Sequence, residues 1–173
     1  GFVLYHNSAH AQAGRSGGDG QGFALGVGWS TSYSAHIVGT SISTTVKVIA
    51  DDGSENNFAH VGSAFVSPAG IYDRLTRIED PEQPDSGIMV WILTRRDQSK
   101  LAFADAGNLI RQIDSAGNVV RIARDSEHSN RITHISSAAE GLTDVTSHRV
   151  VLSYDDDQLS SYTDVLGRVW TFS

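Results

Sequence analysis

The stretch Leu109-Ile-Arg-Gln-Ile-Asp114-Ser-Ala-Gly117-Asn-Val-Val-Arg-Ile122 recurs near the end of the chain as Leu159-Ser-Ser-Tyr-Thr-Asp164-Val-Leu-Gly167-Arg-Val-Trp-Thr-Phe172. The two segments share a leucine, then an aspartate, a glycine, a valine and a large apolar residue at equal spacing. Strand-like residues stand on both sides of the Asp-x-x-Gly core in each segment. Each segment therefore predicts a β-hairpin, and two matching hairpins predict a protein built from repeats.

The Asp-x-x-Gly core also predicts the geometry of the turn. The carboxylates of Asp114 and Asp164 are placed to accept hydrogen bonds from amide groups two residues further on. Gly117 and Gly167 are placed where the backbone takes a positive φ, which glycine adopts readily because it has no Cβ. Both hairpins are expected to contain a type I turn followed by a left-handed residue.

The second hairpin and the residues before it resemble the YD repeats of the Rhs family. The family's order of tyrosine–aspartate, leucine, aspartate and glycine–arginine is matched by Tyr154-Asp155, Leu159, Asp164, Gly167-Arg168 and Phe172. Phe103-Ala-Asp105 before Leu109 is a looser version, in which phenylalanine stands in place of tyrosine. The resemblance implies that both segments are YD-like repeats.

A third, degenerate unit can be proposed between these two. It begins at Arg124-Asp125, and its return strand is the segment 149–154, which leads into the last unit. A polar loop over roughly residues 136–147 replaces the turn and interrupts the repeat. Within this loop, residues 137–145 make at most one helical turn, because Gly141 interrupts their apolar spacing.

The start of the chain is similar to the segment that opens an Rhs shell. In the family, a strand that carries an Asn-Ser pair, here Asn7-Ser8, precedes a glycine–tryptophan strand, here Gly26-Val-Gly28-Trp29. From the residues themselves, Gly26 and Gly28 predict a bulge beside a buried Trp29, because a phosphate-binding loop would need a third glycine and a following helix. Residues 9–22 predict a long loop. The resemblance covers most of the chain, from about residue 3 to the end.

Further strands are predicted between these regions. Ile42, Thr44, Val46 and Val48 would share one face of a strand, followed by a turn at Asp51-Asp52-Gly53-Ser54 and a return strand over residues 57–61. Residues 88–94 are apolar at successive positions, which predicts a buried central strand. Residues 79–87 are acidic, contain two prolines and predict a surface loop.

Composition agrees with an all-β protein. The 173 residues include 17 glycines and 3 prolines, which favours many tight turns, and no window of ten residues shows a convincing apolar stripe at helical spacing. We therefore predict an all-β fold, in which antiparallel hairpin repeats form a curled sheet. The sheet would be one continuous domain, with an N-terminal hairpin part over residues 1–102 and the YD-like repeats over residues 103–173.

Charge and composition also limit the partners of the chain. The net charge is −7, with 13 lysines and arginines and no basic run, which disfavours nucleic acid as a partner. The chain has no cysteine and therefore no disulfide or thiolate metal site. No apolar run approaches the roughly 20 residues of a membrane-spanning helix, so we expect no membrane insertion.

No group of residues predicts catalysis, a metal site or a cofactor. His6 and His10 have the spacing of metal ligands on a helix, but they lie in a predicted strand and a glycine-rich loop. Asp155-Asp156-Asp157 lacks the spacing of a calcium loop, and no serine lies in a nucleophile elbow. Asp80-Pro81 does not match the self-cleaving aspartate centre of Rhs proteins. We therefore predict that the chain is not an enzyme and binds no cofactor.

The resemblance implies a structural function. In the Rhs family, the sheet coils into a hollow shell that encloses a C-terminal polypeptide, often a toxin. The resemblance implies a bacterial protein that is secreted or located at the cell surface and is delivered by a secretion system. The chain would then be a fragment of a longer protein, with further repeats and the enclosed polypeptide as its partners, and with possible self-association. The alternative is an extracellular adhesion, filament or glycan-binding module.

Overall fold

The computed structural model describes residues 4–6, 29–128, 131–137, 149–156 and 158–172. Regular structure in these residues consists of β-strands. In chain order, the strands are Leu4–His6 (β1), Trp29–Thr31 (β2), His36–Val38 (β3), Thr45–Ile49 (β4), Glu55–Val61 (β5), Ala64–Val66 (β6), Arg74–Glu79 (β7), Met89–Thr94 (β8), Lys100–Ala104 (β9), Leu109–Ile113 (β10), Val119–Arg124 (β11), Ile132–Ser137 (β12), Arg149–Asp155 (β13), Gln158–Thr163 (β14) and Val169–Thr171 (β15).

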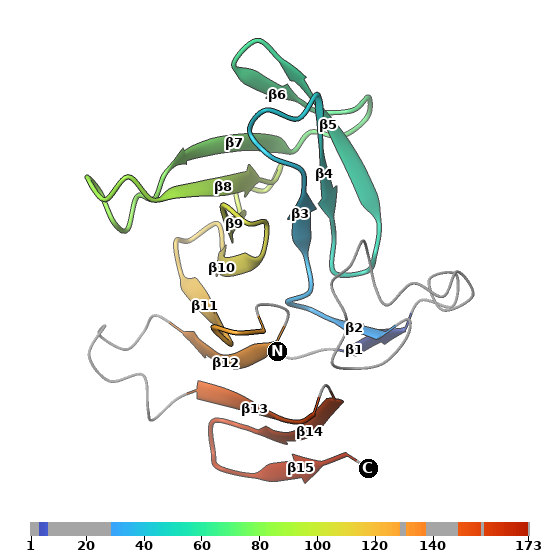
Figure 1. Cartoon of the computed structure of the whole chain (residues 1–173), viewed down its shortest axis with the longest axis vertical. Helices are drawn as coiled ribbons and strands as arrows, with labels where there is room; N and C mark the ends of the chain where they lie inside the picture. Colours follow the sequence, from blue (N-terminus) through green and yellow to red (C-terminus); the bar gives the residue numbers. More distant parts are fainter. Residues whose placement is uncertain (1–3, 7–28, 129–130, 138–148, 157, 173) are drawn as a thin grey trace.

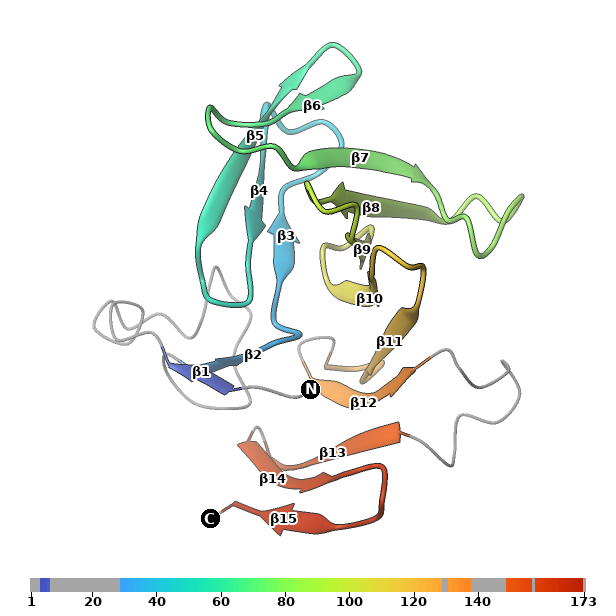
Figure 2. The ribbon, with the colours of Figure 1, turned by 180° about the vertical axis from the view of Figure 1, so that it is seen from behind.

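Strands β3 to β15 form one antiparallel sheet of 13 strands, and β1 pairs with β2 in a separate small sheet. The strands follow one another across the large sheet in sequence order from β3 at one edge to β15 at the other, so the sheet is a continuous series of hairpins without crossovers. Figures 1 and 2 show that the sheet curls but does not close. The predicted all-β fold of antiparallel hairpins is confirmed. The boundary predicted between residues 102 and 103 falls within β9, and the sheet continues across it.

The curl brings the start of the sheet back against its middle. The amide of Ile37 in β3 donates to the carbonyl of Gly107 in the β9–β10 turn at 2.9 Å, and His36 forms an isolated bridge with Asn108. Strand twist produces such curvature, and a register shift between β9 and β10 lies next to this contact. Further register shifts occur in β11 and β13, beyond the contact. Beyond this contact, β11 to β15 continue past the curl (Figure 1).

The inner face of the curled sheet carries the main hydrophobic core. Trp91, Phe103 and Leu109 are fully buried in it, and Leu152 and Leu159 extend it toward the end of the chain. Val90, Ile92 and Ala102 form a smaller buried cluster on the opposite, outer face. Strand β8 is therefore buried on both faces, which confirms the central strand predicted for residues 88–94 except at Ile88, which precedes β8 and is 46% exposed.

Two predictions about local structure need correction. Ile42 and Thr44 were expected to share one face of a strand with Val46 and Val48, but both precede β4, and Ile42 is 89% exposed. The reason is a turn, in which the Ser43 amide donates to the Thr40 carbonyl and Gly39 has a φ of +127°. This turn separates β3 from β4.

The second correction concerns the predicted surface loop over residues 79–87. Glu79 belongs to β7, and Asp80 is only 2% exposed, although residues 81–88 lie at the surface. The predicted loop over residues 136–147 begins later than expected, because β12 continues to Ser137. The remainder of that loop, the loop over residues 9–22 and the Gly26–Gly28 bulge lie outside the described residues, as does the side chain of Trp29.

Candidate functional site

The turn at Asp114 has the predicted geometry. The Asp114 Oδ1 atom accepts hydrogen bonds from the amides of Ala116 at 2.9 Å and Asn118 at 2.8 Å, and Gly117 has a φ of +91°. The Asn118 side chain donates to Asp114 Oδ2 and, with the backbone amides, lowers the pKa of the Asp114 carboxyl. The Asp114 carboxylate thus stabilises the turn through hydrogen bonds to the residues that form it.

The turn at Asp164 repeats this arrangement. Its Oδ1 atom accepts from the amides of Leu166 and Arg168, each at 2.9 Å, and Gly167 has a φ of +78°. Here the Arg168 side chain takes the place of the asparagine and donates from Nε to Asp164 Oδ2 at 2.7 Å. The prediction that the two segments form matching hairpin turns is confirmed.

The same backbone turn occurs at three further places. These five-residue turns span residues 50–54, 95–99 and 104–108. In each turn, the amide of the first residue donates to the carbonyl of the fifth residue, and the amide of the fourth residue donates to the carbonyl of the first. The left-handed fourth residues are Gly53, Gln98 and Gly107. The turn at 104–108 was not predicted, because Phe103-Ala-Asp105 was assigned as the lead-in to the next repeat. The sequence Asp105-Ala-Gly107, an aspartate followed closely by a glycine, is the feature from which this turn could have been predicted.

The Tyr-Asp pair that begins the last repeat divides between core and surface. Tyr154 packs against the main core, and its hydroxyl donates to the carbonyl of Ile132 at 2.9 Å. Burial raises the pKa of Tyr154 to about 12. Asp155 is exposed at the end of β13, opposite Gln158. Tyr154 therefore joins β13 to β12, whereas Asp155 marks the turn into β14.

The hairpin formed by β14 and β15, called here the terminal hairpin, lies at the edge of the sheet. Cross-strand pairing places Leu152, Tyr162 and Trp170 in a row on the inner face, and the rings of Tyr162 and Trp170 lie 5.4 Å apart. Trp170 and Phe172 remain 45% exposed, whereas Ile122, which corresponds to Phe172 in the first repeat, is 5% exposed. Ile122 is more buried than Phe172 because β12 pairs with β11 on the far side of the first hairpin, whereas no described residue pairs with the outer edge of β15.

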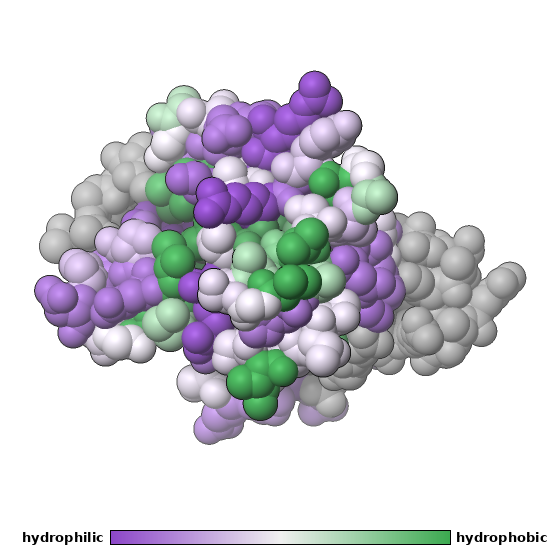
Figure 3. Space-filling view, turned by 90° about the horizontal axis from the view of Figure 1, so that it is seen from above, coloured by the Kyte–Doolittle hydropathy of each residue, from purple (hydrophilic) through white to green (hydrophobic). Residues whose placement is uncertain are grey.

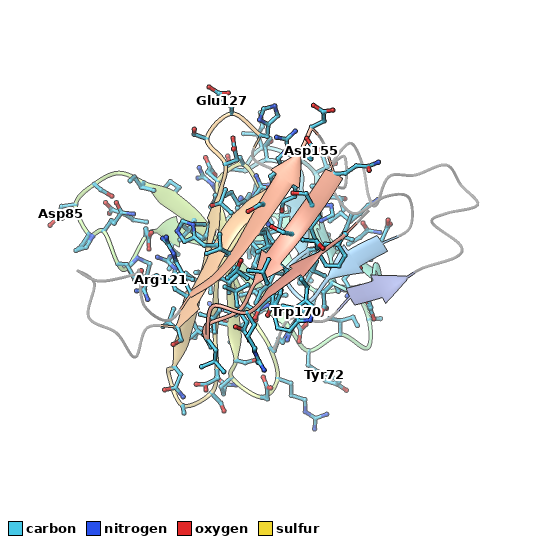
Figure 4. The ribbon with its side chains drawn as sticks, turned by 90° about the horizontal axis from the view of Figure 1, so that it is seen from below. Tyr72, Asp85, Arg121, Glu127, Asp155 and Trp170 are labelled. Carbon is cyan, nitrogen blue, oxygen red and sulfur yellow. The ribbon has the colours of Figure 1, made fainter. Side chains whose placement is uncertain are left out.

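Exposed apolar side chains are concentrated in the terminal hairpin. Among the described residues, eleven large hydrophobic side chains are exposed, and five of them lie within eight residues of sequence: Val165, Leu166, Val169, Trp170 and Phe172. Figure 4 shows Trp170 at the side of the last strands. At the other end of the molecule, seen in Figure 3, hydrophobic patches are separated by hydrophilic residues. The terminal hairpin is therefore the principal candidate for an interaction surface.

The outer face carries an ion-pair network that the sequence did not predict. Arg111 binds Asp80 through two hydrogen bonds of 2.7 and 3.1 Å and binds Glu82 at 2.8 Å. Arg121 binds the second oxygen of Glu82 at 2.9 Å. Burial disfavours the charged form of Asp80, but hydrogen bonds from Arg111 and from the Glu82 amide outweigh it and lower its pKa. Residues 80–88, the acidic loop, are thereby held against the sheet.

The described residues contain no group of three His, Cys, Asp or Glu side chains that could hold a metal ion. His10 and Asp157 lie outside these residues, so the absence of a metal site stays a prediction. The described part of the chain contains no helix that is long and apolar enough to cross a membrane.

Comparison with known proteins leaves the family open. Neither a protein-family model nor a curated protein matches the sequence. The resemblance to the Rhs family therefore rests on the repeat residues themselves.

Proposed function

We propose that the chain is a non-catalytic structural section of a YD-repeat shell of the Rhs type. In this proposal, hairpins add edge to edge to a curled sheet, which encloses a toxin-like polypeptide of the same parent chain outside the cell that makes it. The observation that supports it best is the terminal hairpin, which repeats the turn of the first repeat but has a partly exposed inner-face row and an outer edge that no described residue pairs with.

A further strand beside β15 would complete the packing that the earlier strands already have. Ile122 is buried in the position that Phe172 occupies at 45% exposure. Full burial of a large apolar side chain contributes about 1.5–3 kcal/mol, so covering Trp170 and Phe172 would stabilise the sheet appreciably. A further hairpin of the same repeat is the neighbour that preserves both the antiparallel pairing and the inner-face row.

This edge makes self-association the expected behaviour of the isolated chain. We expect sedimentation velocity to show concentration-dependent association of the unmodified chain, and the Trp170→Lys variant to remain monomeric. Lysine on an edge strand opposes pairing with another edge because its charge would have to be brought into the contact. The matched control is Ile42→Lys, which also places a lysine at an exposed apolar position, away from the terminal hairpin.

The proposal fails if the unmodified chain is monomeric at all concentrations, or if Trp170→Lys and Ile42→Lys reduce association equally. A monomer would favour the alternative, an extracellular adhesion, filament or glycan-binding module. The apolar tip of the terminal hairpin supports this second candidate, because Val165 and Leu166 stand where the first repeat has Ser115 and Ala116.

A further inference from the structure

Three arginines lie in a row across the outer face of four adjacent strands. Arg111 in β10 pairs with Arg121 in β11, Arg121 pairs with Ser136 in β12, and Ser136 pairs with Arg149 in β13. Residues directly opposite each other in antiparallel strands present their side chains on the same face. We call Arg111, Arg121 and Arg149, with Ser136 between the last two, the arginine row.

One end of the arginine row already binds carboxylates. Asp80 and Glu82 are two residues apart in the acidic loop, and together they bind Arg111 and Arg121 on neighbouring strands. Both residues lie in a turn, in which the Gln83 amide donates to the Asp80 carbonyl at 2.9 Å and the Glu82 amide donates to Asp80 Oδ1 at 3.0 Å. The turn places the two carboxylates within reach of arginines on neighbouring strands, whose backbones lie about 4.8 Å apart. The acidic loop thus shows how an acidic segment with carboxylates at alternate positions binds this face.

The other end of the row lacks a carboxylate among the described residues. Arg149 is half-buried, and no ion pair joins it to a described acid. Burial first, and then the charge of Arg149, lower the pKa of His134. The arginine row therefore contains three positive charges, against two carboxylates supplied by Asp80 and Glu82.

We propose that Arg121 and Arg149, on either side of the buried Ser136, form a binding site for an acidic peptide segment that carries carboxylates at alternate positions. The acidic loop binds Arg111 at one end of the arginine row, and such a segment would make the same kind of contact further along the row. Arginine suits this role because its planar guanidinium binds a carboxylate through two parallel hydrogen bonds. About 10 Å separates the backbones of Arg121 and Arg149, two strands apart, so carboxylates of one short peptide can reach both.

The site is independent of the proposed shell function. Register places the arginine row on the outer face and Trp170 on the inner face. In Figure 4, Arg121 lies toward the loop that carries Asp85, whereas Trp170 lies toward β1 and β2. A peptide on the row and a strand beside β15 would therefore not compete.

Fluorescence anisotropy with a labelled peptide of alternating serine and glutamate tests the site on the full chain. We expect Arg149→Ala to weaken binding at least tenfold, Arg149→Lys to weaken it less, and a glutamine version of the peptide not to bind. The control Arg96→Ala removes the same charge from an exposed residue in the β8–β9 turn, whose ring contact is with Tyr72, and is expected to change binding less than twofold. Binding should also weaken as salt is added.

Equal losses for Arg149→Ala and Arg96→Ala, or no binding by the unmodified chain at low salt, would overturn the proposal. Arg149→Gln retains most of the side-chain stem. If this variant also loses peptide binding while its melting temperature is unchanged, misfolding does not explain the loss of binding. Tighter binding of a phosphoserine peptide or an oligonucleotide, dependent on Arg149, would replace the carboxylate ligand by a phosphate ligand and contradict the proposed class.

Discussion

Replacing Gly107 with alanine is expected to lower the free energy of unfolding by about 3 kcal/mol. Gly107 lies where the β9–β10 turn meets β3, and a Cβ atom there would be 2.2 Å from the Ile37 carbonyl oxygen. Its φ of +97° adds strain for any L side chain. Because the obstructing atom belongs to the backbone, the two parts of the sheet must separate, which weakens the 2.9 Å hydrogen bond from Ile37.

Gly117 provides the matched control for this substitution. Its φ of +91° is similar, but a Cβ atom would have nothing within 4 Å. Gly117→Ala should therefore cost only the backbone strain, about 1–2 kcal/mol, and Gly167→Ala the same. Urea unfolding followed by tryptophan fluorescence measures all three. Equal losses at Gly107 and Gly117 would show that contact between β3 and the turn does not stabilise the fold.

The Arg111→Leu variant is expected to lose about 3–5 kcal/mol of stability at neutral pH. The substitution removes the guanidinium that binds Asp80, and the Asp80 side chain is 2% exposed, so an unpaired charge is left inside the protein. The control is Arg77→Leu, which breaks the pair with Asp105, whose side chain is 57% exposed. That pair is expected to contribute about 1 kcal/mol or less, since solvent screens it.

The loss in Arg111→Leu is expected to shrink as the pH falls. In the unmodified protein the pKa of Asp80 is lowered, so its contribution is complete above the usual value of 3.8 and is lost as the pH falls through the lowered pKa. In the variant, a buried carboxyl without its arginine has a raised pKa, and protonation relieves the cost. Urea unfolding at pH 7 and pH 4 checks this. A constant difference between the two proteins would contradict the account.

Local features of the fold were predictable from the sequence. The turns at Asp114 and Asp164 follow from hydrogen bonds within five consecutive residues, so the Asp-x-x-Gly pattern contains the information needed. The apolar residues of β8 likewise indicated a strand buried on both faces. Ile42 misled because the turn that exposes it depends on Gly39 and on the Ser43 hydroxyl, which accepts from the Thr40 amide.

Features that depend on the curl were not predictable. Arg111 and Asp80 are 31 residues apart, and only the path of the sheet brings them together. The same holds for Gly107 and Ile37, whose contact depends on how far the sheet bends through twist and bulges. The arginine row depends on the register of four strands, and one irregular position in a strand moves side chains to the opposite face.

The central claim is that β15 is an open edge on which a further repeat packs. The most direct test is to extend the chain after residue 173 with an Asn-Gly turn and a copy of residues 109–122, a hairpin that contains no tryptophan. Sedimentation velocity, thermal melting and tryptophan emission are then compared for residues 1–173, the extended chain and an extension of shuffled sequence. We expect the extended chain alone to be monomeric, to melt at a higher temperature and to emit at shorter wavelength, because Trp170 becomes buried. A stable monomer of residues 1–173 that the extension leaves unchanged would contradict the claim.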